Sequence, residues 1–189
     1  MTKTILLVDN NDSFTMNINQ ILEELGCLVE IINYTKVNCE VIKDFEKIII
    51  SPGPGHPNEY SFYTKILDEY ITSKSFLGIC LGMQVLGLYF GAKLKHCEPI
   101  EHGKQSRNII ISPSVLFKDV PQATKIGRYH SWSLDRLNFP NELIINSIAE
   151  DNEIMSISHK KFKVFGVQFH PESYITEYGD KILKNWIED

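Results

Sequence analysis

The chain has 189 residues, a length that fits one ordinary domain with a hydrophobic core. Hydrophobic residues make up 43% and charged residues 23%, and a formal net charge of −5 argues against a nucleic-acid-binding surface. No apolar run is long enough to span a membrane, and Asp9 and Asn10 interrupt the first apolar stretch. We therefore expect a cytosolic protein without a signal peptide, folded as one domain over residues 1–189.

The first half of the chain alternates between strand and helix patterns. Short apolar runs predict strands over residues 4–8, 28–32, 47–51 and 76–79. Apolar residues at helical spacing predict helices after residues 9–15, over 59–71 and over 81–90, the first capped by Asp12 or Ser13 and ended by Gly26. This alternation predicts an α/β fold with an open, mostly parallel sheet and helices on both faces.

The pattern changes after residue 91. Short strand-like runs at 108–111, 125–128, 143–145, 154–158 and 164–169 predict additional mixed or antiparallel strands beside the parallel core, and 179–187 is typical of a helix. Polar or glycine-rich turns follow three of the first strands, at 9–15, 51–57 and 78–82. Because ligands bind beyond the carboxyl ends of parallel strands, we expect the functional site there.

Of the four cysteines, Cys27, Cys39, Cys80 and Cys97, no two form a CxxC pair, which argues against a zinc or redox site. Cys80 lies in the sequence GICLG, between an apolar strand and a helix. This is a thiol version of the nucleophile elbow, in which a sharp turn exposes the nucleophile and the flanking glycines avoid clashes. The helix N-terminus favours the thiolate, and the N–H of Leu81 is a candidate oxyanion donor.

A second candidate group follows the strand that ends in VQF. His170 is suited to take the thiol proton and return it to a leaving amine, and Glu172 is suited to orient that imidazole. The two lie far from Cys80 in the chain, so only folding brings them together. The pairing of an elbow cysteine with a distant histidine indicates a thiol-based catalyst.

Other polar segments are compatible with substrate binding. The loop SPGPG at 51–55 combines rigid prolines with permissive glycines and is a candidate for a second oxyanion donor, although it lacks a phosphate-loop signature. Gln84 lies one helical turn after Cys80, where its amide can bind a polar substrate group. Tyr129, His130, Ser131 and Trp132 form a polar and aromatic cluster. His56, His96, His102 and His159 show no metal-ligand spacing, and we assign them no function.

Taken together, these segments resemble the class I (triad-type) glutamine amidotransferases along nearly the whole chain. The matching segments are SPGPG at 51–55, GICLGMQ at 78–84, GRYHS at 127–131 and GVQFHPES at 166–173, with Thr176 and Gly179 after the last. The opening DNNDSFTMN at 9–17 is similar to that of the glutaminase subunits of anthranilate synthase and aminodeoxychorismate synthase. The resemblance implies a flavodoxin-like fold. Asn11, Met16 and Trp132 depart from the family pattern.

The resemblance also implies roles for individual residues. It makes Cys80 the nucleophile, His170 the general base and acid, and Glu172 its orienter. It makes the backbone N–H groups of Gly55 and Leu81 the oxyanion donors. The residues implied to line the glutamine pocket are Gly53, Pro54, Gly55, Gln84, Ser131 and Trp132.

The resemblance further implies a partner, because the ammonia released from L-glutamine needs an acceptor site. In these families that site is on a chorismate-binding synthase subunit that uses Mg²⁺, in a heterodimer or heterotetramer. The glutaminase subunit itself needs no metal or organic cofactor. The product is anthranilate, for tryptophan biosynthesis, or 4-amino-4-deoxychorismate, for folate biosynthesis, and the sequence leaves both open.

The sequence also leaves three alternative functions open. The first is a glutaminase that serves another acceptor, such as a nucleotide synthase or carbamoyl phosphate synthase. The second is a cysteine hydrolase of γ-glutamyl compounds, and the third is a non-catalytic binding subunit. DNNDSFT argues against the first, Gln84 and SPGPG against the second, and the complete triad against the third.

Overall fold

The computed structural model describes residues 4–97 and 103–189. Its main feature is a nine-stranded sheet in the order β2-β1-β3-β4-β11-β10-β9-β6-β7, accompanied by a separate ribbon of β5 and β8. The first five strands of that order are mutually parallel, and the remaining four continue the sheet with antiparallel pairings. The expected parallel core with added antiparallel strands is therefore confirmed.

The strands are short and mostly buried. Their bounds are β1 Thr4–Asp9, β2 Leu28–Asn33, β3 Lys47–Ile50, β4 Ser75–Ile79, β5 Leu94–His96, β6 Lys104–Ile110, β7 Ala123–Arg128, β8 Trp132–Leu134, β9 Leu143–Ile148, β10 Ile154–His159 and β11 Val164–Val167. The helices are α1 Thr15–Glu24, α2 Cys39–Ile42, α3 Phe62–Tyr70, α4 Leu81–Tyr89 and α5 Gly179–Glu188, with 3-10 turns η1 Tyr34–Lys36, η2 Pro57–Tyr60 and η3 Val115–Phe117.

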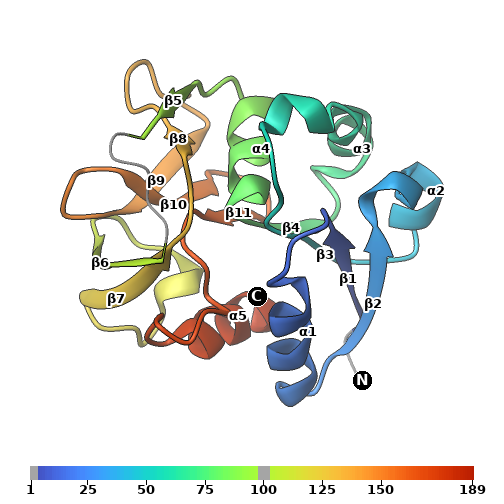
Figure 1. The fold of residues 1–189 in the computed structure, drawn as a ribbon. Coiled ribbons are helices and arrows are strands. Elements are labelled where there is room, and N and C mark those ends of the chain that lie inside the picture. The colour runs from blue at the N-terminus through green and yellow to red at the C-terminus, as the bar shows by residue number, and fades with distance from the viewer. Residues whose placement is uncertain (1–3, 98–102) are drawn as a thin grey trace.

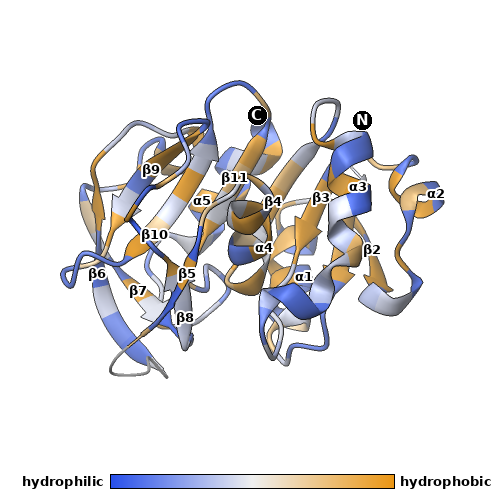
Figure 2. Ribbon diagram, turned by 90° about the horizontal axis from the view of Figure 1, so that it is seen from above, coloured by the Kyte–Doolittle hydropathy of each residue, from blue (hydrophilic) through white to orange (hydrophobic). Residues whose placement is uncertain are grey.

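Helices cover both faces of the parallel core, as the alternation of elements predicts. Figure 1 shows α1 and α5 on one side of the sheet and α3 and α4 on the other. Alternate residues of β1 follow this division, since Ile5 and Leu7 pack with α1 and α5 whereas Leu6 and Val8 pack with α3 and α4. In Figure 2 the hydrophobic colour is concentrated on β3 and β4 in the middle of the sheet.

Two local expectations need correction, and one feature lies outside the predictions. Neither Asp12 nor Ser13 caps α1, which begins after Phe14 without a side-chain cap; the Asp12 carboxylate instead accepts from the Phe14 N–H at 2.8 Å. The helix expected from residue 59 begins only at Phe62, because Pro57 and a capping box of His56 and Glu59 shape the preceding turn as 3-10. The sequence pattern does not predict the ribbon of β5 and β8, because three-residue strands carry too little periodicity.

The parallel strands run in the flavodoxin-like order, which reverses direction between β1 and β3. The chain segments leaving these two strands are joined at that point, because Asn10 donates to the Ser51 carbonyl at 2.9 Å and the Ser51 hydroxyl accepts from the Asn10 N–H at 3.0 Å. Tyr63 of α3 donates to the Asn10 side chain at 2.9 Å. The edge where ligands bind in such sheets is thus rigidly built. Within residues 4–97 and 103–189, no helix combines the length and apolarity that crossing a membrane requires.

Candidate active site

Cys80 lies at the sharp turn between β4 and α4, as the elbow pattern predicts. Its backbone has φ 53° and ψ −105°, a positive-φ conformation that non-glycine residues rarely adopt. Two hydrogen bonds fix the turn: the Cys80 N–H donates to the carbonyl of Val167 in β11 at 2.8 Å, and the Cys80 carbonyl accepts from the Gln84 N–H at 3.2 Å. The surrounding structure therefore holds the strained Cys80 in place.

The glycines on either side of Cys80 are required by close backbone contacts. A Cβ on Gly78 would meet the backbone of Gly82, with the Met83 nitrogen at 2.5 Å. A Cβ on Gly82 would meet the carbonyl carbon of Ile50 in β3 at 2.9 Å, with the carbonyl oxygen closer still. The elbow and the first turn of α4 are thus pressed against the sheet where only hydrogen atoms fit.

His170 and Glu172 form a buried pair beside the cysteine. The Nδ1 atom of His170 lies 2.6 Å from Oε1 of Glu172, and their side chains are 2% and 0% exposed. Among the described residues, neither the other imidazole nitrogen, Nε2, nor Oε2 of Glu172 has a hydrogen-bond partner. The imidazole is therefore held by the carboxylate through one nitrogen and keeps the other available for chemistry.

The electrostatics of this group favour a charged imidazole. Burial lowers the pKa of His170, but the Glu172 carboxylate and the interaction with Cys80 outweigh it and hold this pKa well above its usual value. Cys80 follows β4 and His170 follows β11, and these strands are parallel neighbours in which Ile79 pairs with Val167, so the thiol and the imidazole lie at the same edge of the sheet. Thiol, imidazole and carboxylate therefore lie together at this edge, as a thiol-based triad requires.

Residues downstream of Glu172 hold the segment of His170 and Glu172 in position. The Thr176 hydroxyl donates to the His170 carbonyl at 2.6 Å and accepts from the Gly127 N–H at 2.9 Å, while the His170 N–H donates to the Gly127 carbonyl at 3.1 Å. Gly179 begins α5 directly against Pro171, whose carbonyl carbon would lie 2.7 Å from a Cβ at that position. The backbone on both sides of the histidine and carboxylate is therefore fixed.

Two aromatic rings complete the surroundings of the imidazole. Phe14 and Tyr129 pack on His170, with ring centroids 5.2 Å and 5.0 Å from it. Phe14 comes from the turn after β1, and Tyr129 from the turn after β7. The turns at this edge of the sheet therefore enclose the triad with apolar surface as well as supplying its polar groups.

A pocket with a volume of about 240 Å³ opens next to Cys80. The turns after β1, β3, β4 and β7 form its walls. Its lining consists of Asp12, Gly53, Pro54, Gly55, Cys80, Leu81, Gln84, Tyr129, His130, Ser131 and Trp132. Cys80 therefore lies in the wall of a cavity large enough for a small polar substrate.

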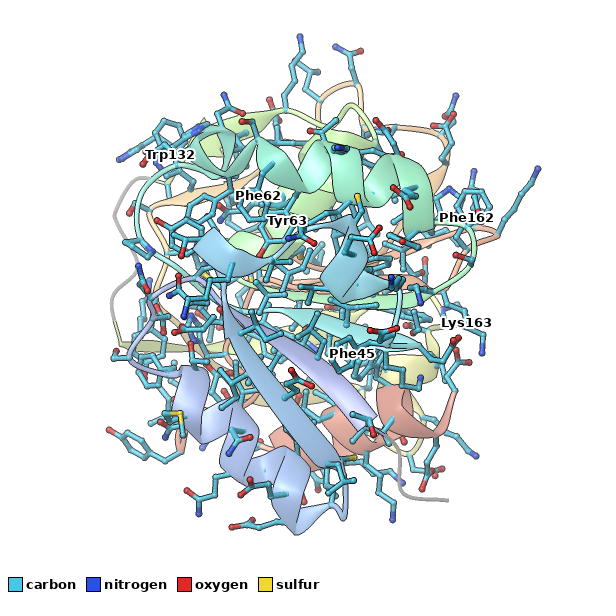
Figure 3. All side chains as sticks on the ribbon, turned by 90° about the vertical axis from the view of Figure 1, so that its right-hand side faces the viewer. Phe45, Phe62, Tyr63, Trp132, Phe162 and Lys163 are labelled. Carbon is cyan, nitrogen blue, oxygen red and sulfur yellow. The ribbon has the colours of Figure 1, made fainter. Side chains whose placement is uncertain are left out.

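The structure brings together all the residues expected to bind substrate or an oxyanion. Gly55 has φ 76°, a conformation that glycine adopts freely, and Gly53 allows its loop to approach Leu81 closely. The Gln84 amide donates to the Trp132 carbonyl at 2.7 Å, which ties α4 to the 129–132 loop. Figure 3 shows Trp132 at the opposite end of the molecule from Phe162 and Lys163, which precede β11.

The sequence patterns give several contributors to this site no catalytic or binding role. Asp12 and His130 line the pocket, Phe14 packs on His170, and the side chain of Gln168 donates to the Cys80 sulfur at 3.5 Å. Phe14 and Asp12 belong to the segment DNNDSFT, whose place at the end of a strand is the signal that points to them. Nothing in the spacing of Gln168 distinguishes it from an ordinary strand-end residue.

The remaining histidines of the described residues make structural contacts. His56 accepts from the Asn58 N–H at 3.2 Å and packs edge-on against Trp132, as His96 does from another side. His159 stacks on Phe162 with ring centroids 4.3 Å apart. His102 lies outside the described residues.

The chain matches known proteins over nearly its whole length. The family model "Glutamine amidotransferase class-I" matches residues 6–189. The chain is 42% identical over 190 residues to anthranilate synthase component 2 of Saccharolobus solfataricus, covering 96% of each chain. It is 37% identical over 183 residues to a putative anthranilate synthase component II of Haemophilus influenzae, covering 97% of this chain and 95% of that one. It also matches 32% of the bifunctional protein TrpGD of Thermotoga maritima, at 38% identity and over 98% of this chain.

Solved structures show the same fold at lower identity. A GMP synthase subunit from Thermoplasma acidophilum, described as putative, has a TM-score of 0.90 at 23% identity, covering all of this chain and 94% of that one. A glutamine amidotransferase from Thermotoga maritima has a TM-score of 0.77 at 19% identity, covering all of this chain and 82% of that one. At these identities the likeness concerns the fold alone.

Proposed function

Because this chain belongs to the class I glutamine amidotransferases, we propose that it is the glutaminase subunit of an anthranilate synthase. It hydrolyses L-glutamine through a thioester on Cys80 and delivers ammonia to a chorismate-using synthase subunit. The observation that carries the proposal is the strained Cys80 at the pocket wall, backed by the buried His170 and Glu172 pair at 2.6 Å.

The first half of the reaction forms the thioester. The Cys80 thiolate attacks the side-chain carboxamide carbon of glutamine, and the N–H groups of Gly55 and Leu81 stabilise the resulting oxyanion. One such donor typically lowers the barrier by about 3–4 kcal/mol. The imidazolium of His170 then donates its proton to the departing nitrogen, the carbon–nitrogen bond breaks, and ammonia leaves. Because its pKa is raised, the His170 imidazole carries that proton at neutral pH.

The second half releases glutamate. The neutral His170 takes a proton from water, and the resulting hydroxide attacks the thioester carbon. The carbon–sulfur bond breaks, Cys80 leaves as thiolate, and His170 is again protonated. Side chains and water suffice for these steps, so we propose that this subunit needs no cofactor and that Mg²⁺ acts in the synthase subunit.

The synthase subunit is proposed to dock around the pocket mouth. Met16, two residues from Phe14, is 60% exposed, and Tyr174, two residues from Glu172, is 94% exposed. Exposed apolar side chains next to a site that must pass on a reactive product are suited to an interface. Such a complex would work in the cytosol, as a heterodimer or a heterotetramer. Replacing Tyr174 by Asp should weaken copurification of the two subunits, and unchanged copurification would contradict this placement.

The proposal assigns glutamine hydrolysis to this chain and amination of the acceptor to the synthase subunit. It is tested with the complex in which Cys80 is replaced by Ala. Glutamine-dependent product formation should be lost, whereas formation from ammonium salts should persist, because the acceptor site is on the other subunit. Cys39→Ala is the matched control, since this thiol lies outside the pocket. Equal loss of both activities in the Cys80 variant would refute the proposal.

The pathway is tested by supplying chorismate, Mg²⁺ and glutamine to the complex copurified from its native cell. The names of the relatives favour anthranilate, the ortho-substituted product. A para-substituted aminated product would instead assign the chain to folate biosynthesis. Release of ammonia without any aminated chorismate would point to another acceptor.

A further inference from the structure

The side chain of Gln168 lies between the substrate pocket and the nucleophile. It is fully buried just after β11, and its Nε2 donates to the Cys80 sulfur at 3.5 Å. Its Oε1 accepts from Nε2 of Gln84 at 3.1 Å. The proposed reaction steps use neither of these contacts, although one of them reaches the reacting atom.

The direction of the Gln168 amide is set by its neighbours. Gln84 must present its NH₂ group to the Trp132 carbonyl, which only accepts hydrogen bonds. The same NH₂ group then faces Gln168, so Gln168 must turn its carbonyl toward Gln84 and its own NH₂ toward the sulfur. A flipped Gln168 would place two donors against each other and an oxygen against the sulfur.

The Trp132 carbonyl is itself anchored from the other side. Arg128 is 1% exposed and donates through Nε to Nε2 of His130 at 3.2 Å. Because Nε2 accepts this bond, the proton of a neutral His130 is on Nδ1, which lies 3.0 Å from the Trp132 carbonyl. Burial and the nearby Arg128 charge lower the pKa of His130 to about 3, which keeps this imidazole neutral. Two donors therefore converge on one carbonyl and fix its orientation.

We propose that Gln168 is a hydrogen-bond donor that stabilises the Cys80 thiolate, and that Gln84 and the Trp132 carbonyl fix the direction of that donor. The role of this hydrogen bond in turnover rests on the proposed function. A hydrogen bond to a charged acceptor is stronger than one to a neutral acceptor, so the contact favours thiolate over thiol. With both amide protons engaged, Gln84 keeps its Oε1 as an acceptor for a donor group of the substrate.

The test measures alkylation of Cys80 by iodoacetamide in the full chain between about pH 6 and pH 10, with the Cys80 peptide quantified by mass spectrometry. Gln168→Met removes the donor with little change in volume. Alkylation at about pH 7 should slow roughly tenfold, as expected for the loss of one modest charge-assisted hydrogen bond, and should approach the wild-type rate at high pH. Gln122→Met, at an exposed position whose side chain bonds the Ile110 carbonyl, is the control and should match wild type.

A second variant tests the direction of the amide without replacing the group that contacts the sulfur. Gln84→Met removes the donor that holds the Gln168 carbonyl without adding a charge, so the Gln168 amide is free to flip and to turn its oxygen toward Cys80. Alkylation at about pH 7 should again slow, with recovery at high pH. Profiles that superimpose on wild type in both variants would overturn the proposal, as would slowing that is equal at every pH.

The same preparations separate this inference from the proposed function. The wild-type complex is assayed for ammonia release from glutamine alongside the alkylation series. Ammonia release with unshifted alkylation profiles would remove the Gln168 proposal alone. Shifted profiles without ammonia release from the wild-type complex would support the contact and refute the glutaminase assignment.

Discussion

Replacing Gly82 by Ala should destabilise the protein, although Ala is the better helix former. Helix propensity alone favours Ala over Gly by about 1 kcal/mol. At Gly82, however, the added Cβ would lie 2.9 Å from the Ile50 carbonyl carbon and nearer still to its oxygen, and both belong to the backbone of a central strand. Helix α4 would have to move by about 1 Å to restore normal contact distances.

Gly87 in the same helix provides the matched control. A Cβ there would meet the side chain of Leu134, whose two δ-carbons would each lie at 2.6 Å at the end of a flexible side chain. Overpacking costs about 1–3 kcal/mol, and more where backbone must move, so Gly82→Ala should lose about 2–4 kcal/mol net. For Gly87→Ala a smaller packing cost is offset by propensity, and we expect a change within about 1 kcal/mol.

Urea unfolding of the two variants measures the difference. Glutaminase activity of the complex gives a second readout, because a shift of about 1 Å at a catalytic group can lower the rate about 100-fold. If Gly82→Ala were as stable and as active as Gly87→Ala, the close approach of α4 to β3 would not be the reason for glycine in the elbow.

Three further predictions concern the triad and its surroundings. Glu172→Gln should lower the pKa of His170, because the carboxylate charge raises it, and should reduce kcat by about 10²–10⁴, as measured by histidine NMR titration and ammonia release. The folded-state pKa of His130 is about 3, below its ordinary value of 6.5. Between these values the unfolded chain binds a proton at His130 that the folded protein does not, so stability falls as the pH drops below about 6.5. At about pH 5 this loss of stability amounts to roughly 2 kcal/mol. The variant His130→Asn lacks the titrating group, so between about pH 7 and pH 5 it should lose roughly 2 kcal/mol less stability than wild type in urea titrations. Equal losses of stability in the two proteins would contradict this prediction. Gly179→Ala should displace Pro171 and lower glutaminase activity, whereas unchanged activity would show that α5 shifts without moving the triad.

Much of the fold follows from local sequence patterns. The apolar runs of β1, β3 and β4 and the helical spacing in α1 and α4 depend on neighbouring residues, and the structure confirms these elements. The elbow is local too, because a strand, a G-x-C-x-G turn and a helix specify the strained backbone at Cys80 within a few residues. The first turn of α1 and the short strands β5 and β8 escape prediction because their signals are weak or shared with loops.

Residue types and their local spacing identify the chemistry of the site: a thiol at an elbow, a histidine with a carboxylate two positions on, and permissive glycines in the adjoining loops. How these residues meet depends on the tertiary structure. The contacts of Gln168 with Cys80 and Gln84, and of Arg128 with His130, join side chains whose positions depend on strand order and helix packing. Hydrogen bonds require partners within about 3.5 Å and suitable angles, and sequence spacing does not encode distances between separate elements.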